Sequence, residues 1–234
     1  MLWLHEVHTV AGRHEDAFEH AFRDGWMPAL AAGDDARLCW FLRLAHGTGR
    51  AYQVVTLTAL RDGAAYERLA TRVQRGDLRA WAADVDRYRH EVQGKLLLAV
   101  DWSPLQDLDL SSVPADGRVH EPALYMEDSA WPYEAKLDEY LDAARTHYAP
   151  SLEARTERSL LTLLAVFQAA IGAPRRREVV LWQRVDHPER LPALFTRELP
   201  PEVKRAGTWM HDALAVRDDW ESRLLRSAEW SPLG

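Results

Sequence analysis

A short segment near the amino terminus, Leu2 to Val10, carries the residue types best suited to acid–base chemistry: His5, Glu6 and His8. A histidine titrates near neutral pH, and a desolvated carboxylate has a raised pKa, so either type can transfer a proton. The segment alternates and is rich in aromatic and β-branched residues, which predicts a strand. Adjacent strand residues point to opposite faces, so His5 lies on one face and Glu6 and His8 on the other. Either face would bring an ionisable group into a ligand cavity.

Six further side chains on or beside predicted strands are expected to bind a substrate. Aromatic walls favour a flat, apolar ligand, and an arginine in a dry site stabilises a developing oxyanion. Two alternatives stay open, namely that the tryptophans pack in the core and that an arginine, Arg43 or Arg184, pairs with Glu6. The six residues are Trp40, Arg43, Tyr52, Gln168, Trp182 and Arg184.

The elements that must position these residues follow the order β-α-β-β-α-β, which is that of a ferredoxin-like unit. Hydrophobic periodicity and turn residues predict the order twice along the chain. The first unit has strands at 2–10, 37–45, 52–60 and 95–102, with helices at 15–32, 63–73 and 78–92. The second has strands at 123–127, 160–168, 178–185 and 222–230, with helices at 134–148, 188–198 and 203–219.

The two units are also related in sequence, because Trp102-Ser103-Pro104-Leu105 recurs as Trp230-Ser231-Pro232-Leu233. The correspondence continues upstream through Trp81 and Trp209, and further upstream it pairs Phe41 with Phe167 and Glu6 with Glu127. A duplication is the simplest cause. It divides the chain into a first repeat at 1–105, a linker at 106–122 that is rich in turn residues, and a second repeat at 123–234.

The duplication separates residues shared by both repeats from residues present in one. Shared residues are expected to serve the fold, which favours a structural ion pair for Glu6 and Glu127. In the alignment of the two repeats, His5 corresponds to Met126 and His8 approximately to Ser129. Their lack of counterparts is what specialisation of one half would leave, so we predict catalytic roles for His5 and His8, together with Glu6.

These features together resemble the dimeric α/β-barrel superfamily, and within it the NIPSNAP-like proteins in tandem form. The resemblance rests on the element order, on Leu4-His5-Glu6, on Trp26-Met27-Pro28 and on Trp102-Ser103-Pro104. It implies an α+β fold in which two tandem ferredoxin-like repeats pack sheet to sheet as an intramolecular pseudo-dimeric barrel. The superfamily includes cofactor-free monooxygenases, cyclases, isomerases and haem-dependent enzymes, so the fold alone does not select a function.

Composition narrows the function classes. The net charge of -7 argues against a nucleic-acid partner, and no apolar run is long enough to span a bilayer. The single cysteine, Cys39, excludes an internal disulfide, and a strand predicted from Leu2 leaves no room for a signal peptide, so a cytoplasmic location is expected. Phosphate loops, nucleophile elbows and zinc-binding spacings are absent from the sequence, which predicts no metal and no cofactor.

Two hypotheses follow for function. In the first, the chain is a cofactor-independent enzyme of secondary metabolism that acts on a small apolar or aromatic molecule in the barrel cavity by general acid–base chemistry, through cyclisation, isomerisation or oxygenation. In the second, it is a non-catalytic binding or structural protein whose cavity is filled by its own side chains. An open pocket lined by His5 or Glu6 would favour the first. Self-association into a homo-oligomer is compatible with both hypotheses.

Overall fold

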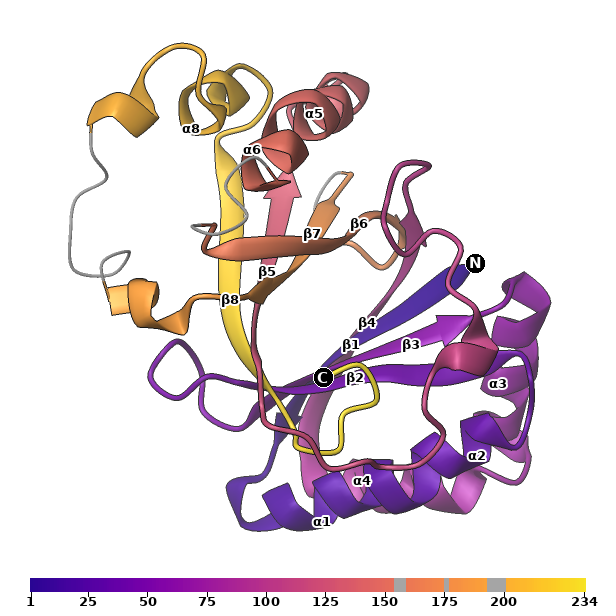
Figure 1. Cartoon of the computed structure of the whole chain (residues 1–234). Coiled ribbons are helices and arrows are strands. Elements are labelled where there is room, and N and C mark those ends of the chain that lie inside the picture. Colours follow the sequence, from indigo (N-terminus) through magenta and orange to yellow (C-terminus); the bar gives the residue numbers. More distant parts are fainter. Residues whose placement is uncertain (154–158, 175–176, 193–200) are drawn as a thin grey trace.

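Eight antiparallel strands form a closed barrel in the computed structural model, in the order β1-β3-β2-β8-β5-β7-β6-β4 (Figure 1). The structure describes residues 1–153, 159–174, 177–192 and 201–234. The strands of the first half are β1 (Leu2–Val10), β2 (Ala36–Leu44), β3 (Gln53–Leu60) and β4 (Arg89–Ala99). Those of the second half are β5 (Leu124–Trp131), β6 (Leu161–Ile171), β7 (Val179–Val185) and β8 (Asp219–Ser227).

Each half contributes a four-stranded sheet, and the two sheets close on each other. The first sheet has the order β4-β1-β3-β2 and the second the equivalent order β8-β5-β7-β6. The edges meet at two seams, where β2 pairs with β8 and β4 pairs with β6. Pairing both edges satisfies backbone groups that an open sheet would expose. The predicted pseudo-dimeric barrel of two ferredoxin-like repeats is confirmed.

Helices cover the outer face of each sheet (Figure 1). The first sheet carries α1 (Glu15–His20), α2 (Met27–Ala31), α3 (Gly63–Arg75) and α4 (Arg79–Tyr88). The second carries α5 (Leu137–Ala143), α6 (Ala149–Glu153) and α8 (Trp209–Asp212). Among the described residues, none of these helices combines the length and apolar character needed to cross a membrane.

The helix predicted at 15–32 contains a wider helical turn next to Pro28. A π-helical segment, Ala21–Trp26, joins α1 to α2 immediately before Pro28. A proline ring clashes with the carbonyl of the preceding turn, and a π turn relieves such crowding while the helix continues. The second half repeats the device at Ala144–Tyr148, before Pro150. The turn aims Phe22 and Trp26 at the first sheet, where both are buried.

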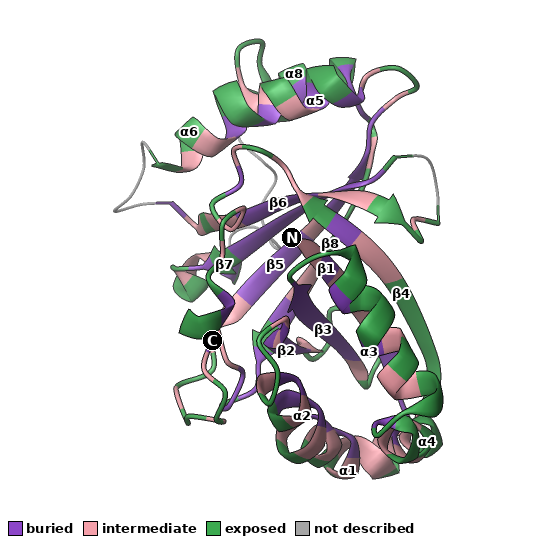
Figure 2. Ribbon diagram, turned by 90° about the vertical axis from the view of Figure 1, so that its right-hand side faces the viewer, coloured by how far each residue is buried: buried purple, intermediate pink, exposed green. Residues whose placement is uncertain are grey.

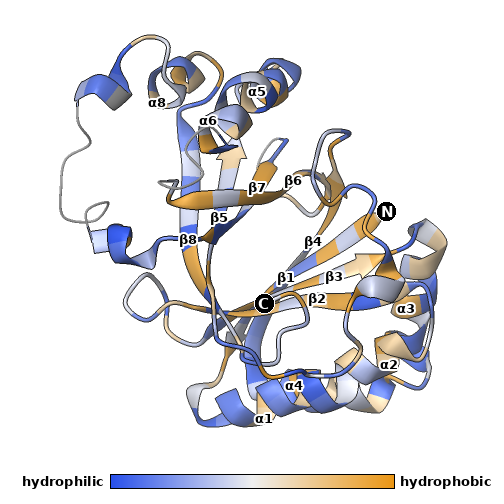
Figure 3. Cartoon of the chain, viewed as in Figure 1, coloured by the Kyte–Doolittle hydropathy of each residue, from blue (hydrophilic) through white to orange (hydrophobic). Residues whose placement is uncertain are grey.

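Apolar side chains fill both faces of the sheets, as the buried and hydrophobic strands in Figures 2 and 3 show. The barrel interior holds a cluster that includes Trp3, Trp40, Trp182 and Phe167. Leu110 and Val113 of the segment joining the halves belong to the same cluster, so this segment packs against the barrel. Separate clusters lie between each sheet and its helices.

Several predicted element boundaries are wrong. β4 begins at Arg89, inside the helix predicted at 78–92, because Arg89 already pairs with Val10 of β1 in the antiparallel ladder. The helix predicted at 203–219 is reduced to α8 and short 3₁₀ turns, and β8 already begins at Asp219. The helix predicted at 188–198 starts as a 3₁₀ turn at Pro188–Arg190, and its end lies outside the described residues. The division at 1–105, 106–122 and 123–234 stays a prediction.

We expect the barrel interior to dominate stability. Leu57 is fully buried inside the barrel, whereas Leu98 on β4 is 45% exposed. Leu57→Ala should lower the free energy of unfolding by about 2–5 kcal/mol through lost burial and a residual cavity. The matched Leu98→Ala change should cost less than about 1 kcal/mol. Urea unfolding of both variants measures the difference, and equal losses would contradict a packed interior.

Candidate functional site

The register of β1 separates the three predicted catalytic residues. Trp3 belongs to the interior cluster, and His5, two residues on, faces the same way and bonds to Glu127 of the opposite sheet. Leu4 packs in the cluster under the helices, and His8 contacts Phe18 and Phe22 there. Glu6 shares this outer face. His5 therefore cannot act on the same ligand as Glu6 and His8.

The predicted equivalence of Glu6 and Glu127 is corrected by the ladders. His5 pairs with Leu57 on β3, and Glu127 pairs with Trp182, the counterpart of Leu57 on β7. Glu127 is therefore the counterpart of His5, and Asp128 is the counterpart of Glu6. Likewise Phe41 lies under the helices and Phe167 in the interior, so these two are not equivalent. A shift of one residue transfers a strand's side chains to the other face.

Inside the barrel, His5 belongs to a buried charge network. Its Nε2 lies 3.1 Å from Oε2 of Glu127, and both side chains are 1% exposed. Arg223 and Lys95 approach the other oxygen of Glu127 at 3.5 Å and 4.0 Å. Although burial opposes ionisation, these neighbours lower the pKa of Glu127, and burial lowers the pKa of His5. A neutral His5 thus donates to an ionised Glu127.

The network continues to a second carboxylate, and both are enclosed. Lys95 also contacts Glu178, which accepts hydrogen bonds from Ser129 Oγ at 3.1 Å and Trp131 Nε1 at 3.3 Å. Two carboxylates and two cations thereby balance within the barrel. Paired buried charges of this kind avoid the large penalty of an isolated one. The structural ion pair predicted for Glu6 and Glu127 is present at Glu127. Its partners are His5, Lys95 and Arg223, which differ from the predicted Arg43 and Arg184.

Of the predicted substrate-binding residues, only Trp40 and Trp182 share a location. Their ring centroids are 5.6 Å apart in the barrel, and Trp3 lies 6.4 Å from Trp40. All three are at most 2% exposed, so they fill the space that they were predicted to line. His5 meets Trp182 edge-on at 6.4 Å. The interior in this region is a packed aromatic core.

The other four predicted binding residues are dispersed. Arg43 faces α1 and pairs with Glu19, while Arg184 is 47% exposed and pairs with Asp186. Tyr52 lies in the β2–β3 turn, 51% exposed, and its ring covers Gly12. Gln168 is next to the interior residue Phe167 on β6 and so faces the opposite way. The structure does not bring these residues to a common site.

An open groove of about 380 Å³ lies on the helix side of the first sheet, and Glu6 is part of its lining. Its walls come from β1, β4, α3, α4 and the π-helical turn. Apolar side chains predominate, and the polar groups are few. The lining residues are Leu4, Glu6, Phe22, Trp26, Tyr66, Leu69, Ala70, Val73, Gln74, Trp81, Ala82, Arg89, Gly94, Lys95, Leu96 and Ile171.

Two stacked indoles form one wall of this groove. The rings of Trp26 and Trp81 lie 4.6 Å apart and 19° from parallel. Trp81 Nε1 donates to the Ala21 carbonyl at 2.8 Å, which fixes the ring against the π-helical turn. A Cβ at Gly25 would lie 2.8 Å from the Trp81 ring, so only glycine permits this approach. The wall is therefore rigid and flat.

Glu6 is the acidic group of the groove, and its carboxylate is unengaged. It forms no hydrogen bond or ion pair with any described residue. Burial raises the pKa of Glu6, the charge of Arg89 opposes that rise, and Asp86 adds to it. A partly buried carboxylate with a raised pKa in apolar surroundings has the properties of a general base.

His8 supports Arg89 and does not line the groove. Arg89 Nη1 lies 2.9 Å from His8 Nδ1, and because a guanidinium only donates, Nδ1 must be the acceptor. The His8 proton therefore resides on Nε2, which donates to Thr56 Oγ1 at 3.1 Å. Burial and the charge of Arg89 hold the pKa of His8 well below its usual value. Arg89 was not among the predicted site residues, because its recurrence as Arg217 in the second repeat favours a structural role.

The carboxylate at the equivalent position of the second half is hydrogen-bonded. Asp128, the counterpart of Glu6, accepts a hydrogen bond from Gln183 Nε2 at 2.8 Å and another from Ser222 Oγ. Tyr148 in turn donates to Gln183. Side chains thus satisfy the second carboxylate, whereas Glu6 faces a groove. Within the described part of the chain, no group of three or more His, Cys, Asp or Glu residues is arranged to hold a metal ion.

The neutral, buried state of His8 predicts an acid-sensitive fold. Below pH 6.5 the unfolded chain binds a proton on His8 that the folded chain does not, so the free energy of unfolding falls as pH falls. His8→Gln should reduce that slope by up to about 1.4 kcal/mol per pH unit. His46→Gln, at an exposed turn, is the matched control. Urea titrations from pH 7 to pH 5 measure the slopes, and identical slopes for wild type and His8→Gln would refute this assignment.

Neither a protein-family model nor a curated protein sequence matches this chain. A solved structure called an anthrone oxidase-like protein aligns over 97% of this chain and 91% of its own, with a TM-score of 0.59 and 10% identity. A putative monooxygenase from Lactobacillus acidophilus NCFM aligns over 96% and 93%, with a TM-score of 0.58 and 6% identity. A NIPSNAP domain protein from Burkholderia xenovorans aligns over 44% of this chain and 97% of its own, with a TM-score of 0.36 and 15% identity. The first two alignments, at these low identities, show a shared fold alone, and the NIPSNAP resemblance stays a prediction.

Proposed function

We propose that the chain is an enzyme that binds a flat apolar or aromatic small molecule in the groove beside α3 and uses Glu6 as its general base. The observation that carries the proposal is the unengaged carboxylate of Glu6, whose counterpart Asp128 is hydrogen-bonded. A partly buried carboxylate without partners lowers stability, and such a cost is typical of a functional site.

The groove has the features that this ligand class requires. The stacked pair of Trp26 and Trp81 offers a planar apolar surface, and α3 contributes Leu69, Ala70 and Val73. Pockets for small molecules are mostly apolar with a few oriented polar groups. Here those groups include Glu6 and Arg89, which both line the groove.

In the proposed step, Glu6 accepts a proton from an acidic C–H or phenolic O–H of the ligand. The electron pair left behind becomes an enolate or phenolate, and the positive charge of Arg89 stabilises its oxygen. His8, Thr56 and Asp86 hold Arg89 in place through hydrogen bonds and an ion pair. Proton abstraction opens routes to cyclisation, isomerisation or oxygenation, and it uses side chains alone. The monooxygenase and anthrone oxidase names of structures with this fold make oxygenation in secondary metabolism the first reaction to test.

A second candidate function is ligand binding without chemistry. It is favoured by the barrel interior, where Trp3, Trp40 and Trp182 occupy the centre. In this case the groove would bind the same class of molecule, and Glu6 would only orient it. Turnover, measured separately from binding, distinguishes the two functions.

We expect Glu6→Gln to retain binding of polycyclic phenols and to lose about 10²–10⁴-fold in turnover, the usual contribution of a general base. Glu91→Gln, on the exposed part of β4, should change neither property. Tryptophan fluorescence reports binding, because Trp26 and Trp81 line the groove, and oxygen consumption or product absorbance reports turnover.

A second variant separates the groove from the barrel. Ala70→Phe fills the groove from α3 and should abolish binding while leaving the thermal unfolding midpoint within a few degrees of wild type. Binding that survives Ala70→Phe would place the ligand elsewhere. Binding without turnover in the wild type would establish the non-catalytic function.

A further inference from the structure

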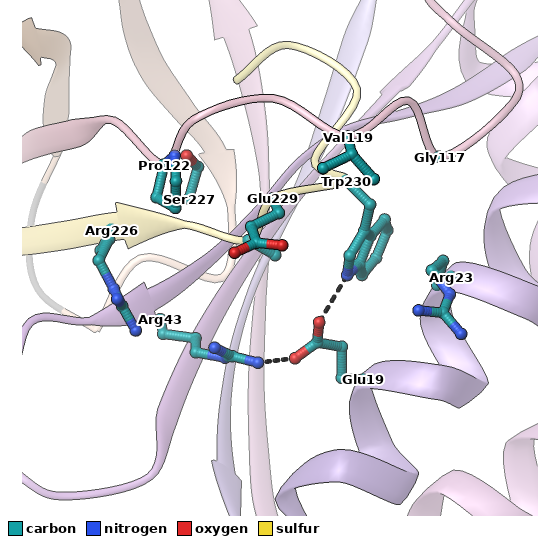
Figure 4. A pocket seen from close by; sticks show the side chains of 11 residues that line it. Glu19, Arg23, Arg43, Gly117, Val119, Pro122, Arg226, Ser227, Glu229 and Trp230 are labelled. Carbon is teal, nitrogen blue, oxygen red and sulfur yellow. Dashed lines mark hydrogen bonds and ion pairs between the residues drawn. The ribbon is translucent and has the colours of Figure 1, made fainter.

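A second hollow, of about 490 Å³, lies at the seam between β2 and β8 and shares no lining residue with the groove of Glu6. It is built from both halves of the chain and the segment that joins them, as Figure 4 shows. Glu19 and Arg23 come from the first helical layer, Arg43 from β2 and Arg226 from β8. The segment around the repeated Trp230 closes one side.

Two arginines face each other across this seam. Arg43 and Arg226 are direct partners in the β2–β8 ladder, and both line the hollow. Like charges placed opposite each other on adjacent strands are destabilising. The equivalent position at the other seam pairs Leu98 with Gln168, which carry no charge. The paired arginines are thus not required for barrel closure.

The charge of only one of these arginines is balanced. Arg43 pairs with Glu19, and its Nε lies 3.7 Å from Glu15. Trp230 Nε1 donates to Glu19 at 2.7 Å, which orients that carboxylate toward Arg43. Arg226, by contrast, has no hydrogen bond or ion pair with any described residue.

The remaining charges set the character of the hollow. Arg23 is engaged by Asp24 through two hydrogen bonds of 2.8 Å and 3.0 Å. Glu229 also lines the hollow, and its carboxylate forms no hydrogen bond or ion pair with any described residue (Figure 4). Because Asp24 balances Arg23 and Glu19 balances Arg43, Arg226 is the arginine of this hollow whose charge no described acidic side chain pairs with.

We propose that this hollow is a binding site for a small molecule carrying a carboxylate or phosphate group, with Arg226 as the principal contact and Arg43 beside it. A guanidinium binds either anion through two parallel hydrogen bonds, so both chemistries fit. The anion would relieve the repulsion between the two arginines. Because the walls come from both halves, a bound anion would also tie the halves together. This site is independent of the function proposed for Glu6.

Calorimetric titration with inorganic phosphate and, separately, with acetate tests the proposal at fixed ionic strength set by chloride. We expect at least one probe to bind the full-length protein, and Arg226→Gln to weaken its affinity by about tenfold, as for one hydrogen bond to a charged group. Glu229→Gln should tighten it, because the variant removes an opposing charge from the wall. Arg75→Gln, a lone exposed arginine on α3, should leave it unchanged.

The opposite signs of the two variants make the result specific, and circular dichroism confirms that each variant is folded. Phosphate binding without acetate binding would assign the phosphate class, and the reverse would assign the carboxylate class. Failure of both probes to bind the wild type would overturn the proposal. So would equal affinities of the wild type and Arg226→Gln, or equal weakening by Arg226→Gln and Arg75→Gln.

Discussion

The closure of two four-stranded sheets into one barrel is the constraint on which the rest of the structure depends. Each sheet presents one face to the other and one to its helices, so apolar residues are required on both faces. Between the sheets, large aromatic rings fill the volume, and the charged groups there balance one another. A closed interior of this type leaves little space for a ligand. Open volume instead lies outside the barrel wall, under α3 and at the β2–β8 seam.

This arrangement explains why Glu6 and His5, which are adjacent, have different roles. His5 points inward, where Glu127 and two cations provide its surroundings. Glu6 points outward to the helical layer, where small residues such as Ala70 and Gly94 line a groove. The same backbone segment thereby contributes to the buried charge network on one face and presents an unpaired carboxylate to the groove on the other. His8, on the same face as Glu6, is buried and does not line the groove. It positions Arg89, which lines the groove together with Glu6.

The fold could be predicted from sequence to a large extent, because the element order and the repeated Trp-Ser-Pro endings reflect local patterns. Glu6 was also recognisable as a candidate base. The strand register between the two repeats could not be predicted from the sequence. A difference of one residue in the repeat alignment decides whether Glu127 matches Glu6 or His5. The surroundings of Glu6 depend on how α3 and α4 pack on the sheet, which local patterns do not encode. Arg43 and Arg184 were predicted from residue type, and their neighbours in space differ from those expected.

Linking the two halves in one chain has an evolutionary consequence. In a symmetric homodimer every substitution occurs in both subunits, so a change that seals one site seals the other. Here Asp128 can be hydrogen-bonded to Gln183 under the helices of the second half while Glu6 keeps its open surroundings. The same freedom allows one seam to carry paired arginines and the other an uncharged pair. Covalent fusion thus allows substitutions that stabilise one half to accumulate without altering the open groove of the other.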